Sequence, residues 1–207
     1  MNPSAEIPFA ESKQERSQKT LENILEAAEQ IVKEADPSLF TSRSLAQKSG
    51  YALGTLVRRL SSVENVFLWA VKKARDKKFQ EIAISITQFD ADTPIYTFAE
   101  IMVDTGFAGA QENSPAVMRF FENRFTKMNG LPPDYFAYMD SLVEPYLVAA
   151  SKNKTDTFRV LSTSEASLLL RQICLLVERP FMEGNPIAGT PEHRRVAIDM
   201  IIRLLGK

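Results

Sequence analysis

A glycine between two short helical patterns, followed at once by a longer helical pattern, is the feature that most constrains the fold of this chain. It lies in residues 41–67, which read TSRSLAQKSGYALGTLVRRLSSVENVF. Thr41 is suited to cap the first short helix, and Gly50 is suited to the left-handed conformation that ends it. Apolar residues at helical spacing predict a buried face on both short helices. The residues expected on this face are Leu45, Ala46, Leu53, Leu56 and Leu60.

Burial of that face leaves outward-facing side chains that suit contacts with DNA. Arginine can contact phosphates or guanine edges, threonine can contact phosphate or a thymine methyl group, and tyrosine can hydrogen-bond phosphate. Free backbone N–H groups at the start of the first short helix also suit phosphate binding. Residues 41–60 therefore predict a helix-turn-helix whose second helix enters the major groove. The predicted DNA contacts are Thr41, Ser42, Arg43, Tyr51, Ala52, Thr55, Arg58 and Arg59.

The same segment resembles the DNA-binding region of the TetR family of transcriptional repressors. The resemblance covers about residues 16–75. It rests on an amphipathic first helix, the capping Thr41, the Ala-x-x-x-Gly spacing of Ala46 and Gly50, the run Gly54-Thr55-Leu56, and the acidic Glu64 that opens the fourth helix. It implies a transcriptional regulator that binds double-stranded DNA.

Two departures from the family pattern leave an alternative open. The family usually has tyrosine where this chain has Val57 and lysine where it has Val63, and both commonly contact phosphate. Their absence weakens the expected anchoring to the DNA backbone. The alternative function is a protein-interaction module whose degenerate helix-turn-helix no longer binds DNA.

Composition indicates a globular protein with an uneven charge distribution. Of the 207 residues, 44% are hydrophobic and 25% are charged, and the net charge is -1. Residues 1–80 hold 13 Lys and Arg against 10 Asp and Glu, whereas the remainder is net acidic. No stretch approaches the ~18 apolar residues of a membrane span, and residues 1–16 lack the pattern of a secretory signal. We therefore expect a cytoplasmic protein without membrane association.

Capping signals and helical periodicity predict an all-α fold of about nine helices, since no segment alternates convincingly as a strand would. Helix starts are marked by Thr93-Pro94, Ser114-Pro115, Thr190-Pro191 and the capping box Ser162-x-x-Glu165. We expect a three-helix, helix-turn-helix DNA-binding domain over residues 1–63, with a disordered tail at 1–12. Residues 64–207 are expected to form a helical ligand-binding and dimerisation domain.

The residue types that carry most metal and nucleophilic chemistry are scarce. The chain has one histidine, His193, and one cysteine, Cys174, so neither type occurs in pairs at ligand spacing. His193 lies at a predicted helix start, where we expect a surface position. Cys174 lies in an apolar run, where we expect a buried thiol without a redox role. We therefore expect no enzyme activity, no metal and no cofactor.

An aromatic and methionine-rich stretch between residues 98 and 146 fits either an ordinary core or the wall of a pocket. TetR-like proteins hold an inducer in this region, so the resemblance implies a pocket between about residues 94 and 148 for a small, largely apolar ligand. The predicted ligand contacts are Met102, Phe107, Met118, Phe121, Arg124, Phe125 and Tyr138.

Two C-terminal segments, residues 164–178 and 191–205, are apolar nearly all round. A monomer of this size would struggle to cover both. In the resembled family the last two long helices pack against their symmetry mates as a four-helix bundle. The resemblance thus implies a homodimer through these segments, a palindromic operator, and a repressor that leaves its operator when the ligand binds.

Overall fold

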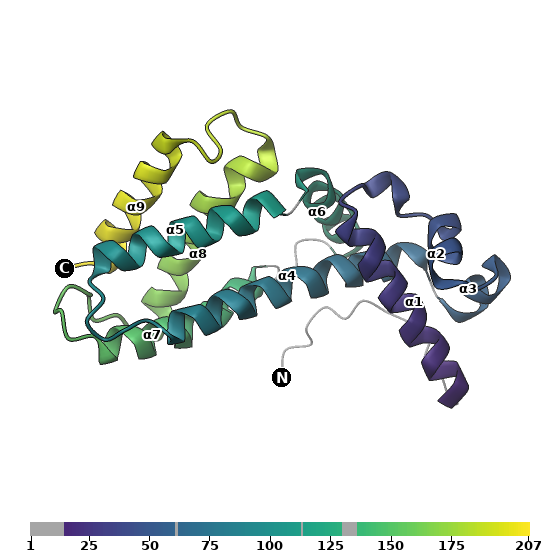
Figure 1. The fold of residues 1–207 in the computed structure, drawn as a ribbon, viewed down its shortest axis with the longest axis horizontal. Coiled ribbons are helices and arrows are strands. Elements are labelled where there is room, and N and C mark those ends of the chain that lie inside the picture. Colours follow the sequence, from purple (N-terminus) through teal and green to yellow (C-terminus); the bar gives the residue numbers. More distant parts are fainter. Residues whose placement is uncertain (1–14, 61, 113, 130–135) are drawn as a thin grey trace. The chain divides into compact units, whose positions relative to one another are not determined.

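The computed structural model describes residues 15–60, 62–112, 114–129 and 136–207, and these residues form helices almost throughout. The prediction of an all-α fold with about nine helices is confirmed, because the described residues contain nine α-helices, two 3-10 helices and no strand. In chain order (Figure 1) the elements are α1 (Glu15–Lys33), η1 (Pro37–Leu39), α2 (Ser42–Ser49), α3 (Leu53–Arg59), α4 (Val63–Thr87), α5 (Ile95–Glu112), α6 (Pro115–Asn129), η2 (Ala137–Leu142), α7 (Val143–Lys152), α8 (Thr163–Glu183) and α9 (Pro191–Leu205).

The helices pack into two compact units, one formed by Met1–Arg75 with Ala116–Pro132 and the other by Asp76–Pro115 with Pro133–Lys207. We refer to them as the N-terminal unit and the C-terminal unit. This division by packing differs from the predicted boundary at residue 63, because residues 63–75 of α4 and most of α6 belong with the first three helices. The tail predicted at residues 1–12 lies outside the described residues.

The core of the N-terminal unit forms where α1 packs on α2 and α2 on α3. Phe40 joins these helices to α4 and α6, since its ring stacks on Phe67 at 4.7 Å and meets Phe120 edge-on at 5.1 Å. The predicted burial of Leu45, Leu56 and Leu60 is confirmed. Further buried side chains of this core are Ile24, Ala27, Ala28, Ile31, Val66 and Phe67.

The expected capping groups open three of the helices. Thr41 Oγ1 accepts the Ser44 N–H at the start of α2, and Thr190 Oγ1 accepts the His193 N–H at the start of α9. The capping box of Ser162 and Glu165 opens α8, as predicted. The start expected at Thr93-Pro94 is shifted, because α5 begins at Ile95 and the Ile95 N–H donates to Thr157 Oγ1 from another segment.

The C-terminal unit is built around α8. Helices α5, α7, α9 and η2 all pack on it, and α5 also packs on α9. Phe98 of α5 contacts the rings of Phe158 and Tyr146 at 5.4 and 6.1 Å, which ties α5 and α7 to the segment before α8. Within the residues described here, no helix is long and apolar enough to cross a membrane.

His193 is buried, which corrects the surface position expected for it. Only 3% of this residue is exposed, and its ring lies 4.5 Å from Phe107 and 5.9 Å from Phe181. Nδ1 accepts the Gly189 N–H at 3.2 Å, so Nε2 carries the proton and donates to the Leu176 carbonyl at 2.9 Å. Pro180 lies inside α8 and lacks the N–H that would normally bond this carbonyl. His193 therefore supplies the donor that the helix is missing.

Candidate nucleic-acid interface

The turn between α2 and α3 depends on Gly50. This residue has φ of +75°, a left-handed conformation, and its N–H closes α2 by bonding the Ala46 carbonyl at 3.0 Å. An L side chain at this φ would be strained even though no atom lies within 4 Å of the place a Cβ would occupy. The glycine thus sets the direction in which α3 leaves the turn, as the sequence predicted.

The polar residues predicted to contact DNA gather on this motif. Thr41, Arg43 and Arg58 are exposed, and Ser42, Thr55 and Arg59 are half-buried. Arg58 lies along α3, where its Nε donates to the Gly54 carbonyl at 3.1 Å. All charged residues of 41–60 are basic, namely Arg43, Lys48, Arg58 and Arg59. Since DNA is a polyanion, this surface carries the sign of charge that DNA binding requires.

Tyr51 has a second structural role beside the predicted one. Its hydroxyl accepts a hydrogen bond from Asn23 Nδ2 at 3.0 Å, which ties the entrance of α3 to α1. A tyrosine hydroxyl both accepts and donates, so its own proton remains available for a phosphate oxygen.

Two apolar side chains of α3 are exposed, and one of them was predicted to be buried. Leu53, predicted to be buried, is 51% exposed, and Val57 is 69% exposed. Side chains of a helix tilt toward its N-terminus, so the side chain of Leu53, the first residue of α3, projects past the end of the helix. Leu60 closes α3 in an extended conformation and still reaches the core. The short length of the helix was the available signal that its terminal residues would not follow helical periodicity.

The residues predicted to bind a ligand are divided between the two units. Met102, Phe107 and Tyr138 belong to the C-terminal unit, whereas Met118, Phe121, Arg124 and Phe125 belong to the N-terminal unit. Phe107 packs on His193 and Phe181, and Tyr138 meets Phe79 edge-on at 4.7 Å. Phe121 lies under the Arg75 guanidinium, and Arg124 forms an ion pair with Glu64 at 3.0 Å. Met102 and Met118 are half-buried, and the side chain of Phe125 lies outside the described residues.

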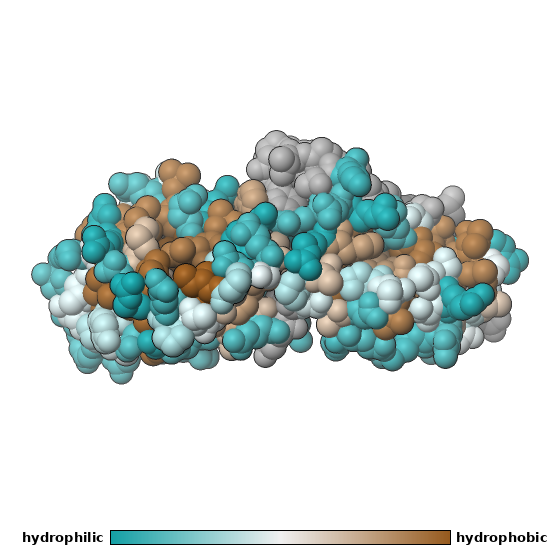
Figure 2. Space-filling view, turned by 90° about the horizontal axis from the view of Figure 1, so that it is seen from above, coloured by the Kyte–Doolittle hydropathy of each residue, from teal (hydrophilic) through white to brown (hydrophobic). Residues whose placement is uncertain are grey.

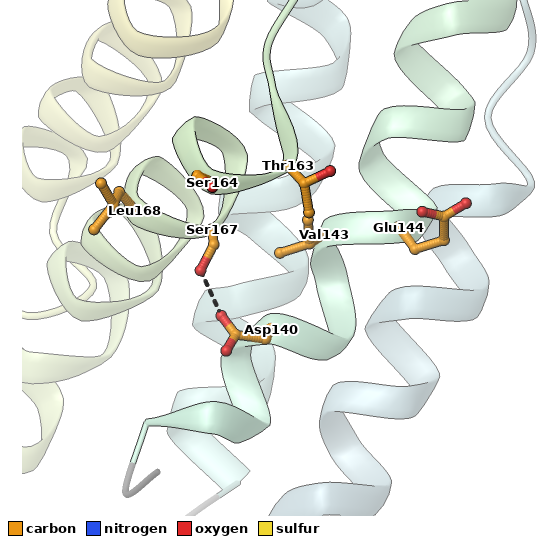
Figure 3. A pocket seen from close by; sticks show the side chains of 7 residues that line it. All are labelled: Asp140, Val143, Glu144, Thr163, Ser164, Ser167 and Leu168. Atoms are coloured by element: carbon orange, nitrogen blue, oxygen red, sulfur yellow. Dashed lines mark hydrogen bonds between the residues drawn. The ribbon is translucent and has the colours of Figure 1, made fainter. Parts of the chain in front are cut away.

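An open pocket of about 640 Å³ lies between η2, α7 and the start of α8 (Figure 3). One carboxylate of its wall is already hydrogen-bonded within the protein, because Asp140 accepts hydrogen bonds from Ser167 at 2.8 Å and from Arg171 Nε at 2.9 Å. The hydrogen bond from Arg171 is the main cause that lowers the pKa of Asp140. None of the predicted ligand contacts lines this pocket. Its lining residues are Asp140, Val143, Glu144, Thr163, Ser164, Ser167 and Leu168.

The only cysteine is half-buried on α8 as a free thiol. Burial raises the pKa of the Cys174 thiol, which disfavours the reactive thiolate. Within the described part of the chain, no three His, Cys, Asp or Glu residues are placed to hold a metal ion.

Helices α8 and α9 present apolar side chains at the surface of the C-terminal unit. Figure 2 shows hydrophobic residues reaching the surface of this unit, on the left. Leu168 is 65% exposed and Met200 is 37% exposed, whereas Ile201 is buried within the single chain. Within residues 164–178 and 191–205, the half-buried apolar residues are Leu169, Cys174, Leu175, Leu176, Val196, Ile202 and Leu204.

Comparison with solved structures identifies the fold. A TetR transcriptional regulator from Rhodococcus sp. RHA1 matches with a TM-score of 0.57 and 17% identity, over 92% of this chain and 97% of that chain. A TetR family transcription regulator from Marinobacter aquaeolei VT8 matches with a TM-score of 0.51 and 19% identity, over 93% and 98%. A TetR-family transcriptional regulator from Haemophilus influenzae RD matches with a TM-score of 0.50 and 15% identity, over 94% and 100%.

No protein-family model and no curated protein matches the sequence. The structural matches nevertheless extend over more than nine tenths of this chain, and all three belong to transcriptional regulators of one family. The chain therefore has the all-α fold of the TetR-family transcriptional regulators.

Proposed function

We propose that this protein is a transcriptional regulator that binds a double-stranded DNA operator through residues 41–60. The observation that carries the proposal is the geometry of α2 and α3, where a left-handed glycine fixes a short helix whose outer side has exposed residues and only basic charges. Such a helix fits the major groove. A mobility-shift titration with operator fragments tests it.

The regulator acts as a repressor that leaves its operator when a small, largely apolar ligand binds the C-terminal unit. Helix α4 supports this coupling because it is one continuous helix that contributes residues to both units. A ligand that favours another tilt of α4 would change the spacing of the two recognition helices in a dimer. They would then no longer match major grooves about 34 Å apart.

Tyr146 offers the ligand a polar contact inside an apolar environment. Its hydroxyl is fully buried on α7 and has no hydrogen-bond partner among the described residues. The ring lies 6.1 Å from Phe98 and 6.4 Å from Phe158, and burial raises the pKa of the phenol to about 12. A buried hydroxyl without a partner costs stability, so a ligand with a hydrogen-bond acceptor would gain affinity there.

An aromatic compound with one hydrogen-bond acceptor that binds this unit should raise the melting temperature and lower operator affinity. The first effect follows from mass action, because the compound binds only the folded protein. The second effect follows because the compound and the operator bind different conformations. Thermal shift and mobility shift on the same compounds measure both. Tyr146→Phe should raise the melting temperature of the free protein, because it removes the buried hydroxyl that has no partner, and should reduce the shift caused by the compound. A compound that stabilises the protein and leaves DNA affinity unchanged would contradict the coupling.

The proposed dimer uses residues 164–178 and 191–205. Each chain alone leaves Leu168 and Met200 exposed on these helices, beside a row of half-buried apolar residues. A second copy related by two-fold symmetry would cover the same face on both chains. A symmetric dimer also predicts a palindromic operator. Ile201 faces the core of its own chain, so it makes no contact with the partner.

Replacing Leu168 by glutamate should convert the dimer to monomers. The change places an unpaired charge in the interface, where burial of a charge is strongly unfavourable. Analytical ultracentrifugation at micromolar concentration measures the result. Val160→Glu is the matched control. It adds the same charge at an exposed position that lies outside both helices. A Leu168→Glu variant that remains dimeric would remove this face from the interface.

One observation favours the alternative function. The exposed Leu53 and Val57 provide an apolar surface of the kind that also suits a protein partner. A protein-interaction module would bind no DNA fragment above the level of random sequence, and this outcome separates the two functions.

A further inference from the structure

Leu53 and Val57 form an apolar pair on the outer face of α3. They lie four residues apart and therefore on one side of the helix, at 51% and 69% exposure. Ala52 before them is exposed, and Gly54 between them has no side chain. The first turn of α3 thus presents carbon atoms to its surroundings and almost no hydrogen-bonding side chain.

Basic residues accompany this apolar pair on the motif. Arg43 is at the start of α2, and Arg58 is in the last turn of α3 with its Nε on the Gly54 carbonyl. Thr55 is the one polar side chain in the first turn of α3, and it is half-buried. Such a surface suits DNA, because its arginines can contact phosphates while its apolar side chains contact base edges.

In a helix-turn-helix, the N-terminal residues of the second helix contact base edges. The apolar group that the major groove exposes on a base edge is the C5-methyl group of thymine. We propose that Leu53 and Val57 recognise thymine methyl groups, so that the operator carries thymines beneath the first turn of α3. The inference rests on the proposed function and adds the chemistry by which the operator is selected.

Deoxyuridine tests this inference because it lacks only the methyl group of thymidine and keeps the hydrogen-bonding edge. The full chain is first used to select an operator from genomic fragments, and the protected site is mapped by footprinting. The operator is then synthesised with deoxyuridine at every thymine of the site. Loss of one buried methyl contact corresponds to about four-fold in affinity. A dimer that loses one such contact in each half-site loses two, so the wild-type protein should bind the uracil operator at least about ten-fold more weakly.

Two variants test whether the apolar pair causes this loss of affinity for the uracil operator. Leu53→Ala with Val57→Ala should bind the thymine operator more weakly than wild type and should no longer distinguish thymine from uracil. Arg58→Ala should lose affinity but keep the wild-type ratio between the two operators. Both changes are at exposed positions, and equal melting temperatures confirm that the fold is intact.

Three results would overturn the inference. Equal affinity of the wild type for both operators would remove methyl recognition and leave DNA binding in place. A ratio that persists in the double variant would take the effect away from the apolar pair and assign it to DNA shape or to another side chain such as Thr55. Absence of binding to any genomic fragment would overturn the proposed function itself and would leave the apolar pair as a surface for a protein partner.

Discussion

Replacing both Arg58 and Arg59 by alanine should lower operator affinity by about a hundred-fold or more and leave the fold intact. Each arginine contact with DNA contributes about 1–3 kcal/mol, and about 1.4 kcal/mol corresponds to ten-fold in affinity. A dimer loses each contact twice. Each lost phosphate contact should also reduce the slope of log affinity against log salt by about one unit. Mobility-shift titrations at several salt concentrations measure both quantities.

The matched control for this variant is Lys152→Ala with Lys154→Ala. It removes the same charge from two exposed positions outside the motif. It should change operator affinity much less than the arginine variant, because it reduces only the long-range attraction to DNA. An arginine variant with wild-type affinity would show that α3 does not read DNA.

Replacing His193 by alanine should destabilise the C-terminal unit by about 3–5 kcal/mol, the largest stability effect that we expect from one substitution. The change removes packing against Phe107 and Phe181, and it leaves the Gly189 N–H and the Leu176 carbonyl without their partner. Denaturation in urea measures the loss of unfolding free energy. The exposed neighbour Arg195 serves as control, and Arg195→Ala should change stability by less than about 0.5 kcal/mol.

A second substitution tests the reason for this loss. Pro180→Ala restores an N–H at the position that can bond the Leu176 carbonyl within α8. Pro180→Ala should therefore raise the unfolding free energy of the His193→Ala variant. This gain should exceed the change that the same substitution causes in the wild type. Additive effects of the two substitutions would contradict the role assigned to His193 as donor to that carbonyl.

The sequence predicted best those features that depend on neighbours in the chain. Thr41 and Gly50 act within one turn of the helix they delimit, and residue type alone decides both roles. Ser162 and Glu165 are a similar case. The predicted burial of Leu53 was wrong. Leu53 is the first residue of α3, so its side chain projects past the end of the helix, and helical spacing does not describe its position.

Features that depend on distant segments were not accessible. His193 is buried and bonds a carbonyl that a proline 13 positions earlier in α8 leaves without a helix donor, and no local pattern joins those two residues. The start of α5 depends on Thr157, 62 residues away. The predicted ligand contacts follow residue type along the chain, and they are divided between two units because most of α6 belongs to the N-terminal unit.

The most direct test of the central claim is binding of the full chain to genomic fragments that flank its own gene, at salt concentrations from about 50 to 200 mM. Operator binding by residues 41–60 predicts one retained fragment, a protected site with two-fold symmetry whose half-sites lie about one helical turn apart, and affinity that falls steeply as salt rises. Retention of every fragment equally, or of none above the level of random DNA, would contradict operator binding by residues 41–60.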